Sequence, residues 1–66
     1  MRIELSVYLS DDMDRKAIVY RNTEKDCYEI DFGKDGLIIG TESYIDHNLQ
    51  YHEDAAENYV LGVKKL

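Results

Sequence analysis

The sequence contains no proline and no tryptophan, and it has a single phenylalanine and a single cysteine. A lone cysteine, Cys27, excludes an internal disulfide and predicts a reducing, cytoplasmic location. The unbroken apolar runs are only a few residues long, which argues against a membrane span, and no charged-then-apolar segment predicts a signal peptide. Without linkers or low-complexity tracts, the 66 residues are expected to form one domain over 1–66.

Basic residues are also scarce, since 8 lysines and arginines face 14 acidic residues and leave a net charge of −6. The charge is uneven, because residues 22–57 carry ten acids and two lysines, a net −8, whereas the remainder carries +2. This balance repels nucleic-acid phosphates and disfavours direct binding of DNA or RNA. It favours instead a protein partner with a basic surface. A homodimer is a further expectation, because it adds core that so short a chain lacks.

Two segments alternate with the period of two that is typical of half-buried strands. In residues 2–9 and 27–32 every second side chain is apolar: Ile3, Leu5, Val7 and Leu9, then Tyr28, Ile30 and Phe32. Between them, residues 10–14 form a polar turn, and the β-branched and aromatic cluster at 18–20 predicts a strand over about 16–21. A helix through Met13, Ala17 and Tyr20 is the alternative for that stretch.

The dipeptide Asp35-Gly36 stands between two strand-like runs and predicts a β-hairpin, whose second strand runs from Leu37 to Ile45. Two registers are open. A two-residue loop sets Phe32 opposite Ile39 and gives the more apolar face, although it also sets Glu29 opposite Glu42. A three-residue loop sets Phe32 opposite Ile38. We favour the first register slightly.

The C-terminal segment predicts an amphipathic helix over about 51–65. Its apolar stripe consists of Ala55, Ala56, Tyr59, Val60 and Val63. Acids in the early turns and Lys64 and Lys65 in the last would complement the helix dipole, and Asp46, His47 or Asn48 would cap the start. The whole chain is therefore predicted to be an α+β domain, an antiparallel four-stranded meander (β-β-β-β-α) with one C-terminal helix packed on one face. Ile30 and Phe32 would face the helix, and Glu29 and Asp31 would face solvent.

Little in the sequence predicts catalysis. Cys27 is flanked by Asp26 and Glu29, which disfavour a thiolate. His47 and His52 are five residues apart and do not share a helix face, so they are expected to be exposed polar residues rather than metal ligands. No glycine-rich phosphate loop is present, and the expected fold has no cleft for a catalytic carboxylate pair. We therefore expect no catalytic residue, no metal site, no cofactor and no enzymatic activity.

The chain has six tyrosines, a high number for its length. Tyr28 and Tyr59 are expected to fill the core, whereas others alternate with acids on exposed faces. Tyrosine is enriched at protein interfaces because it offers a large apolar area with a polar tip. The predicted protein-binding residues are Glu29, Asp31, Glu42, Tyr44, Tyr51 and Glu53.

Five short segments between residues 17 and 64 form a recognisable pattern. They are Val19-Tyr20-Arg21-Asn22, Tyr28-Glu29-Ile30-Asp31-Phe32, Lys34-Asp35-Gly36, Glu42-Ser43-Tyr44, and Glu53 to Gly62. The pattern resembles small accessory proteins of tailed phages, above all cyanophages. Such proteins are generally uncharacterised, so the resemblance carries no site residues over. It implies a small protein made in the cytoplasm of an infected bacterial cell, where many such proteins bind a host enzyme or regulator.

The leading functional hypothesis is a non-enzymatic protein-binding module that modulates its target by steric occlusion or altered assembly. Its negative charge would speed the encounter with a basic partner. The alternatives are a nucleic-acid-mimicking inhibitor of a DNA- or RNA-binding protein, and a structural homo-oligomer.

Overall fold

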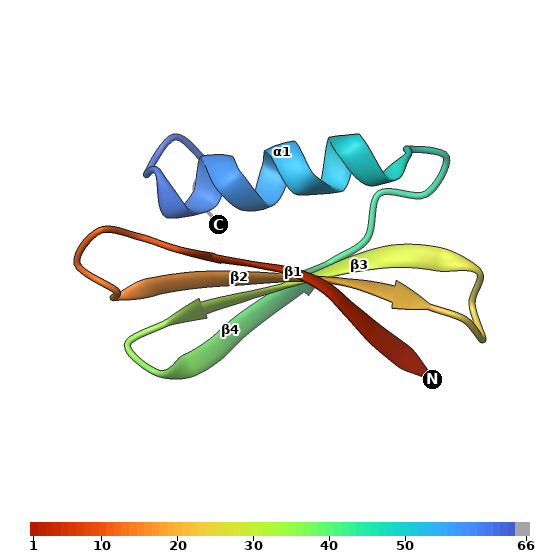
Figure 1. Cartoon of the computed structure of the whole chain (residues 1–66), viewed down its shortest axis with the longest axis horizontal. Helices are drawn as coiled ribbons and strands as arrows, with labels where there is room; N and C mark the ends of the chain where they lie inside the picture. The colour runs from red at the N-terminus through yellow and green to blue at the C-terminus, as the bar shows by residue number, and fades with distance from the viewer. Residues whose placement is uncertain (65–66) are drawn as a thin grey trace.

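The computed structural model describes residues 1–64, which form four strands followed by a helix. The elements are β1 (Arg2–Leu9), β2 (Arg15–Asn22), β3 (Cys27–Lys34), β4 (Leu37–Glu42) and α1 (Leu49–Val60). The strands pair antiparallel in the order β1-β2-β3-β4, and α1 lies across one face of the sheet (Figure 1). The predicted α+β meander is confirmed. Within residues 1–64 there is no helix long and apolar enough to cross a membrane.

The segment before β2 is a turn, and the helical alternative through residues 13–20 is wrong. Met13 has a left-handed backbone angle, φ 61°, which a continuing helix excludes. From Arg15 onward the chain pairs with β1 on one side and β3 on the other. A central strand suits the β-branched residues Ile18 and Val19, both of which are buried.

The β3–β4 hairpin turns on the predicted dipeptide. Asp35 and Gly36 have φ of 53° and 84°, the two positive angles that a type I′ turn needs. Lys34 therefore lies opposite Leu37 across a two-residue loop, as the favoured register requires.

Farther from the loop, both predicted registers are wrong because a β-bulge shifts the pairing between Gly33 and Phe32. Phe32 lies opposite Gly40 rather than opposite an isoleucine. Glu42 lies opposite Ile30, so the expected clash of two glutamates across the strands does not arise. β4 ends at Glu42, three residues earlier than predicted.

Helix α1 is capped by one of the three predicted residues. The Asn48 side chain accepts a hydrogen bond from the Tyr51 backbone N–H at 3.0 Å. At the other end Gly62 adopts a left-handed φ of 84°, and the Val63 N–H returns to the Asn58 carbonyl at 2.9 Å. This reversal ends the helix before the predicted residue 65.

The shorter helix also corrects the predicted charge order. Its first turn holds no acid and its last turn holds no base, so the side chains do not complement its dipole as expected. Val63 is exposed beyond the helix rather than part of its apolar stripe. Lys64 follows the helix, and Lys65 lies outside the described residues.

The core lies between α1 and the sheet face beneath it, which we call the inner face. Four inner-face side chains, Ala17, Val19, Ile30 and Phe32, are fully buried against Ala56, Tyr59 and Val60. The Tyr59 ring packs edge-on against Phe32, with centroids 4.8 Å apart, and its hydroxyl donates to the Gly33 carbonyl at 3.0 Å. Tyr59 is thus in the core as predicted, whereas Tyr28 is only half buried.

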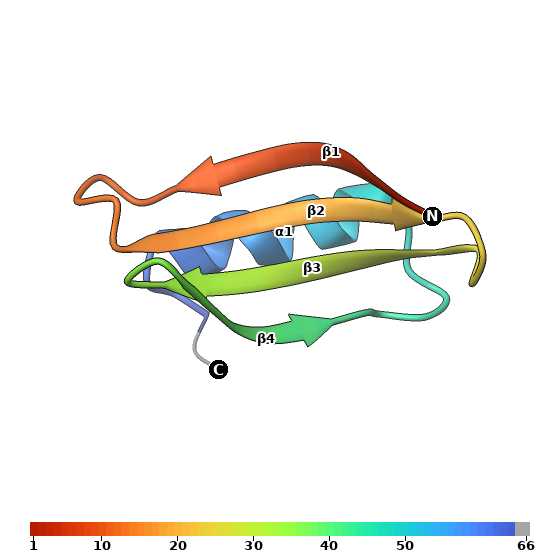
Figure 2. The ribbon, with the colours of Figure 1, turned by 90° about the horizontal axis from the view of Figure 1, so that it is seen from below.

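Strand β1 presents two of its aliphatic residues, Val7 and Leu9, away from the helix, contrary to the expectation that this row is buried. A bulge lies between Glu4 and Ser6, and beyond it Tyr8 pairs with the inner-face residue Ala17. Val7 and Leu9 therefore point to the uncovered side, the outer face, which Figure 2 shows from below. The four aliphatic side chains of β1 are between 42% and 49% exposed.

Candidate protein-binding site

The six predicted contact residues fall at three separate places. Glu29 and Asp31 lie on the outer face, in the middle strands of the sheet. Glu53 lies between α1 and β1. Glu42, Tyr44 and Tyr51 come together where the end of β4 meets the start of α1. One continuous surface of all six is therefore not formed.

The outer-face carboxylates are held by Arg2. Its Nε lies 2.9 Å from Glu29 Oε1, and its Nη2 lies 2.8 Å from Asp31 Oδ1. Asn22 and Thr41 donate further hydrogen bonds, to Glu29 at 3.3 Å and to Asp31 at 2.8 Å. The two acidic side chains are only 11% and 12% exposed, so the prediction of solvated carboxylates is wrong, although their predicted face is right.

The charge pairing has a consequence for the pKa of Asp31. Burial alone would raise the pKa, but the hydrogen bonds from Arg2 and Thr41 and the charge of Arg2 outweigh burial and lower it. Asp31 is thus ionised and neutralised within the chain. A carboxylate already paired in this way contributes little attraction for a basic partner.

Glu53 ties the helix to the edge strand. It accepts a hydrogen bond from Ser6 Oγ at 2.6 Å and another from the Tyr8 hydroxyl. The bond to Glu53, with burial and the nearby acids, raises the pKa of Tyr8 to about 12. Glu53 therefore has a structural role at this position.

The third place is an aromatic cluster, which we call the tyrosine cluster: His47, Tyr44, Tyr51 and His52. The rings of Tyr44 and Tyr51 meet edge to face with centroids 5.1 Å apart, and His47 stacks on Tyr51 at 3.9 Å. Tyr51 is 44% exposed, and His47 is exposed as well. The cluster is a connected aromatic surface at the N-terminal end of α1.

His52 is the buried member of this cluster. It is fully buried, so the expectation of an exposed histidine is wrong. Its Nε2 accepts the Tyr44 backbone N–H at 3.1 Å, and its Nδ1 lies 2.9 Å from the Asn48 carbonyl oxygen. A proton on Nδ1 satisfies both contacts. The ring thereby joins the start of the β4–α1 connection to the helix cap and holds Tyr44 beside Tyr51.

Glu42 and Lys64 form the charged rim of the cluster. Lys64 Nζ lies 3.2 Å from Glu42 Oε1 and 5.7 Å from the Tyr44 ring centroid. The hydrogen bond from the Tyr44 hydroxyl, with the Lys64 ion pair, lowers the pKa of Glu42. The chain thus places one of its own ammonium groups over a tyrosine face.

A surface pocket of about 340 Å³ opens beside the two rings. It is lined by Tyr44, Tyr51, Asp54, Ala55, Asn58 and Lys64. Among residues 1–64, Asp54 accepts a side-chain hydrogen bond from Gln50, through Oδ1 at 2.9 Å. The pocket therefore combines aromatic faces, a carboxylate and an amide with the Lys64 ammonium group, whose charge is paired with Glu42. The first three groups suit a cationic or hydrogen-bonding side chain.

Sequence reasoning missed Asp54, Asn58 and Lys64 as parts of this site. A signal was present for the first two, because Tyr51, Asp54 and Asn58 recur at spacings of three and four and so share one stripe of a helix. Lys64 had no such signal, since only the chain reversal at Gly62 brings it back toward β4.

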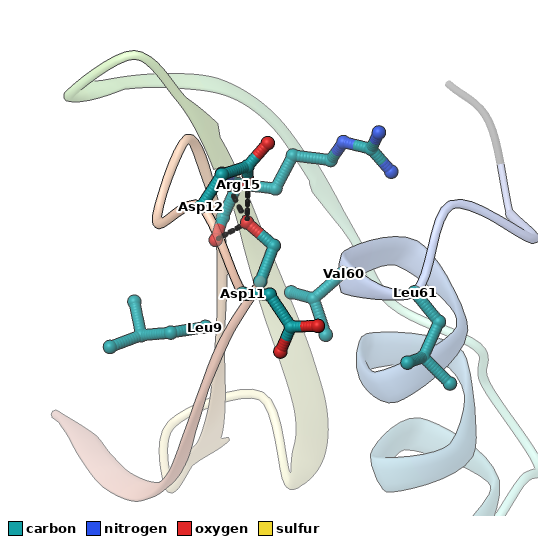
Figure 3. A pocket seen from close by; sticks show the side chains of 7 residues that line it. Leu9, Asp11, Asp12, Arg15, Val60 and Leu61 are labelled. Carbon is teal, nitrogen blue, oxygen red and sulfur yellow. Dashed lines mark hydrogen bonds between the residues drawn. The ribbon is translucent and has the colours of Figure 1, made fainter.

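A second pocket, of about 270 Å³, lies between the β1–β2 turn and the end of α1 (Figure 3). Its polar groups hold the turn together. Ser10 Oγ lies 2.9 Å from Asp12 Oδ1 and accepts the Arg15 backbone N–H at 3.0 Å. The Arg15 guanidinium donates to the Tyr59 carbonyl at 3.2 Å and so closes the end of the helix.

Within the described part of the chain, no group of three or more histidine, cysteine or acidic side chains is placed to hold a metal ion. Cys27 is half buried at the start of β3 and lies opposite Asn22. No family model, curated protein or solved structure matches the chain. The assignment of a function therefore depends on the geometry of its own residues.

Proposed function

We propose that the protein is a non-enzymatic protein-binding module that receives a basic side chain of its partner in the pocket beside Tyr44 and Tyr51. The observation that carries this proposal is the pair of tyrosine rings, 5.1 Å apart, at the edge of a pocket of about 340 Å³ that also presents Asp54. A pocket near the lower end of the range for ligand sites suits one side chain better than a cofactor.

The chemistry favours arginine or lysine. A guanidinium or ammonium group is attracted to the face of a tyrosine ring and also to the Asp54 carboxylate. The ammonium group of Lys64 already lies 5.7 Å from the Tyr44 ring centroid and pairs with Glu42, so Tyr51 and Asp54 are the groups left to attract the partner's cation, against repulsion from Lys64. The partner's side chain would bind alongside Lys64 on the Tyr51 side.

Long-range charge supports the same class of partner. The chain has a net charge of −6, and the helix beside the pocket carries Glu53, Asp54 and Glu57. A negative surface speeds the encounter with a positive one, and this attraction weakens as the salt concentration rises. Binding over this surface would modulate the partner by steric occlusion, and the resemblance to phage accessory proteins favours a bacterial host protein as the target.

The nucleic-acid-mimic hypothesis gains less support. Mimicry needs rows of unpaired carboxylates, but Arg2 pairs with both Glu29 and Asp31, and Arg21 pairs with Asp26.

A defined probe tests the proposal. Titration of the full chain with an arginine-rich peptide, followed by amide NMR, should shift the signals of Tyr44, Tyr51, Asp54 and Asn58. The Tyr51→Ala chain should bind about threefold to tenfold more weakly, because it loses a cation–π contact. The matched pair is Asp54→Asn against Glu57→Gln: both remove one helix charge, but only Asp54 lines the pocket.

Shifts that depend on salt, are lost in Tyr51→Ala and Asp54→Asn, and persist in Glu57→Gln support the proposal. A peptide in which glutamine replaces arginine should leave the spectrum unchanged. Shifts elsewhere on the chain, or equal binding by all variants, would reject the pocket as the binding site.

A further inference from the structure

The outer face of the sheet is divided into a polar half and an apolar half. The polar half contains Arg2 and the carboxylates that it pairs. The apolar half, which we define by Val7, Leu9, Ile18, Gly33 and Ile38, lies toward the turns β1–β2 and β3–β4. Lys16, which pairs with Leu9 and Gly33, places a charged side chain within it. Strand pairing places Val7 beside Ile18 and Ile38 beside Gly33 on this side.

The apolar half is not covered by any element of residues 1–64, since α1 occupies the opposite face (Figure 2). Ile38 is 56% exposed, and Val7 and Leu9 are exposed nearly as much, whereas Ile18 in the central strand β2 is buried. An antiparallel sheet with one solvated face normally alternates apolar side chains inward and polar ones outward. β1 does the reverse, because Ser6 and Tyr8 point inward to Glu53.

A shallow pocket of about 170 Å³ interrupts the apolar half. Its lining includes Gly33 and the apolar residues Leu9, Met13, Leu37 and Ile38, together with the charged residues Asp14, Lys16 and Lys34. A Cβ at Gly33 would lie 3.2 Å from the Leu37 carbonyl oxygen and 3.4 Å from Ile38 Cδ1. The missing side chain therefore keeps this part of the face hollow and able to receive an apolar group.

We propose that a second copy of this chain covers the outer face, so that the protein is a face-to-face homodimer. Its two sheets would stack apolar half on apolar half, at the separation of about 10 Å that is usual for packed sheets. This inference goes beyond the binding function proposed above and uses a different surface.

The size of the face is sufficient for a dimer. The longest and shortest axes of the molecule, which span the sheet in Figure 2, measure 33 Å and 18 Å. A plane of these dimensions is of the same order as the roughly 800 Å² that each partner buries in a standard interface. A second sheet layer would also enlarge a small core, since eight apolar residues are buried among residues 1–64.

Charge also favours a second copy at this face over any other face. Two copies with a net charge of −6 each repel one another through most of their surface. The outer face is nearly balanced, because the charged side chains that strand pairing places there are Arg2, Lys16, Glu4, Glu29 and Asp31. In the Arg2 cluster one guanidinium pairs with two carboxylates, so the two bases and three acids of this face leave a net charge of −1, against −6 for the whole chain. The outer face is thus where like-charged copies approach with the least repulsion.

The dimer leaves free the pocket beside Tyr44 and Tyr51, which we call the tyrosine pocket. That pocket is lined mainly by residues of α1, on the opposite side of the sheet from the proposed interface. A dimer would then present two pockets to a partner and gain avidity wherever the partner offers two basic sites.

Sedimentation equilibrium of the full chain over a range of micromolar concentrations tests the inference. We expect a mass twice the 7.7 kDa of one chain. Ile38→Asp places a charge on the apolar half and should weaken dimerisation by about tenfold or more. Ile45→Asp is the matched control, because Ile45 is 74% exposed but lies in the β4–α1 connection.

A dimer that Ile38→Asp dissociates and Ile45→Asp preserves supports the proposal. If the Ile38→Asp chain unfolds, isotope-filtered NMR of mixed labelled and unlabelled wild-type chains shows instead which residues meet in the dimer. Intermolecular contacts between the methyl groups of Val7, Leu9 and Ile38 are expected, and contacts at other residues would overturn the face-to-face arrangement.

A wild-type chain that stays monomeric at the highest concentration would reject the dimer outright. In that case the peptide titration still reports on the tyrosine pocket, so failure of the dimer and failure of the binding function are separate results.

Discussion

The two faces of the sheet carry similar numbers of apolar side chains but differ sharply in what covers them. On the inner face Val19, Ile30 and Phe32 are fully buried under α1. On the outer face Val7, Leu9 and Ile38 are about half exposed. The inner face has an intramolecular partner, and the outer face has an ion cluster and an open apolar half.

The comparison teaches that apolar alternation identifies a face without identifying its partner. The helix packs on the side where the central strands β2 and β3 offer four apolar residues in adjacent pairs, Ala17 with Phe32 and Val19 with Ile30. The orientation of the edge strand β1 is set by its pairing with β2. Val7 and Leu9 are turned outward because the bulge before Ser6 brings Tyr8 beside Ala17.

Truncation of an inner-face core residue should cause the largest loss of stability, and comparison with an outer-face truncation tests the difference between the two faces. Phe32→Ala should lower the free energy of unfolding by about 3–5 kcal/mol, since it leaves a cavity beside Tyr59. A domain of this size has roughly 3–10 kcal/mol in total, so much of the variant should be unfolded. Val7→Ala, measured in the dilute chain, should cost about 1 kcal/mol or less. Urea unfolding followed by circular dichroism compares them, and equal losses would contradict the asymmetry.

Removal of the outer-face cation should have an intermediate effect. Arg2→Ala leaves Glu29 and Asp31 without their ion pair and should cost roughly 1–3 kcal/mol, less than a fully buried pair because Arg2 is partly solvated. Glu29→Gln with Asp31→Asn in the same background should recover part of the loss. A persistent loss in the triple variant would show that Arg2 acts through its packing on Tyr20 instead.

The same cluster predicts the acid response. The pKa of Asp31 is lower in the folded chain than its usual 3.8, so its stabilisation is present at neutral pH and is lost as the pH falls below that value. Acid titration of unfolding stability should show this loss in the wild type and a much smaller one in Arg2→Ala.

The smallest effect is expected at high pH. Since the pKa of Tyr8 rises from 10.0 to about 12 on folding, its stabilisation is present below pH 10 and is lost between pH 10 and pH 12. Tyr8→Phe should remove this alkaline loss of stability. A smaller loss from Tyr44 should remain, because burial and Glu42 also raise the pKa of Tyr44. Thermal unfolding at a series of alkaline pH values measures the difference. An unchanged step in Tyr8→Phe would show that Glu53 does not hold Tyr8 in solution.

Local patterns were good guides to the elements and poor guides to the site. Asp35-Gly36 and Asn48 were identified because turns and caps depend on a few adjacent residues. The β3–β4 register and the burial of His52 were missed because each depends on contacts across the fold. Three of the six proposed contacts came together, and the pairing of Arg2 with Asp31 had no local signal across 29 residues.

The amino-acid order by itself determined four strands, a helix and their sequence along one meander, because backbone preferences and hydrophobic periods act over a few residues. The tertiary structure alone decided which side of β1 is covered, which carboxylates are neutralised and where the tyrosines meet. Those outcomes depend on two bulges and on the side of the sheet that the helix packs against, and a one-residue shift in pairing turns every following side chain to the other face.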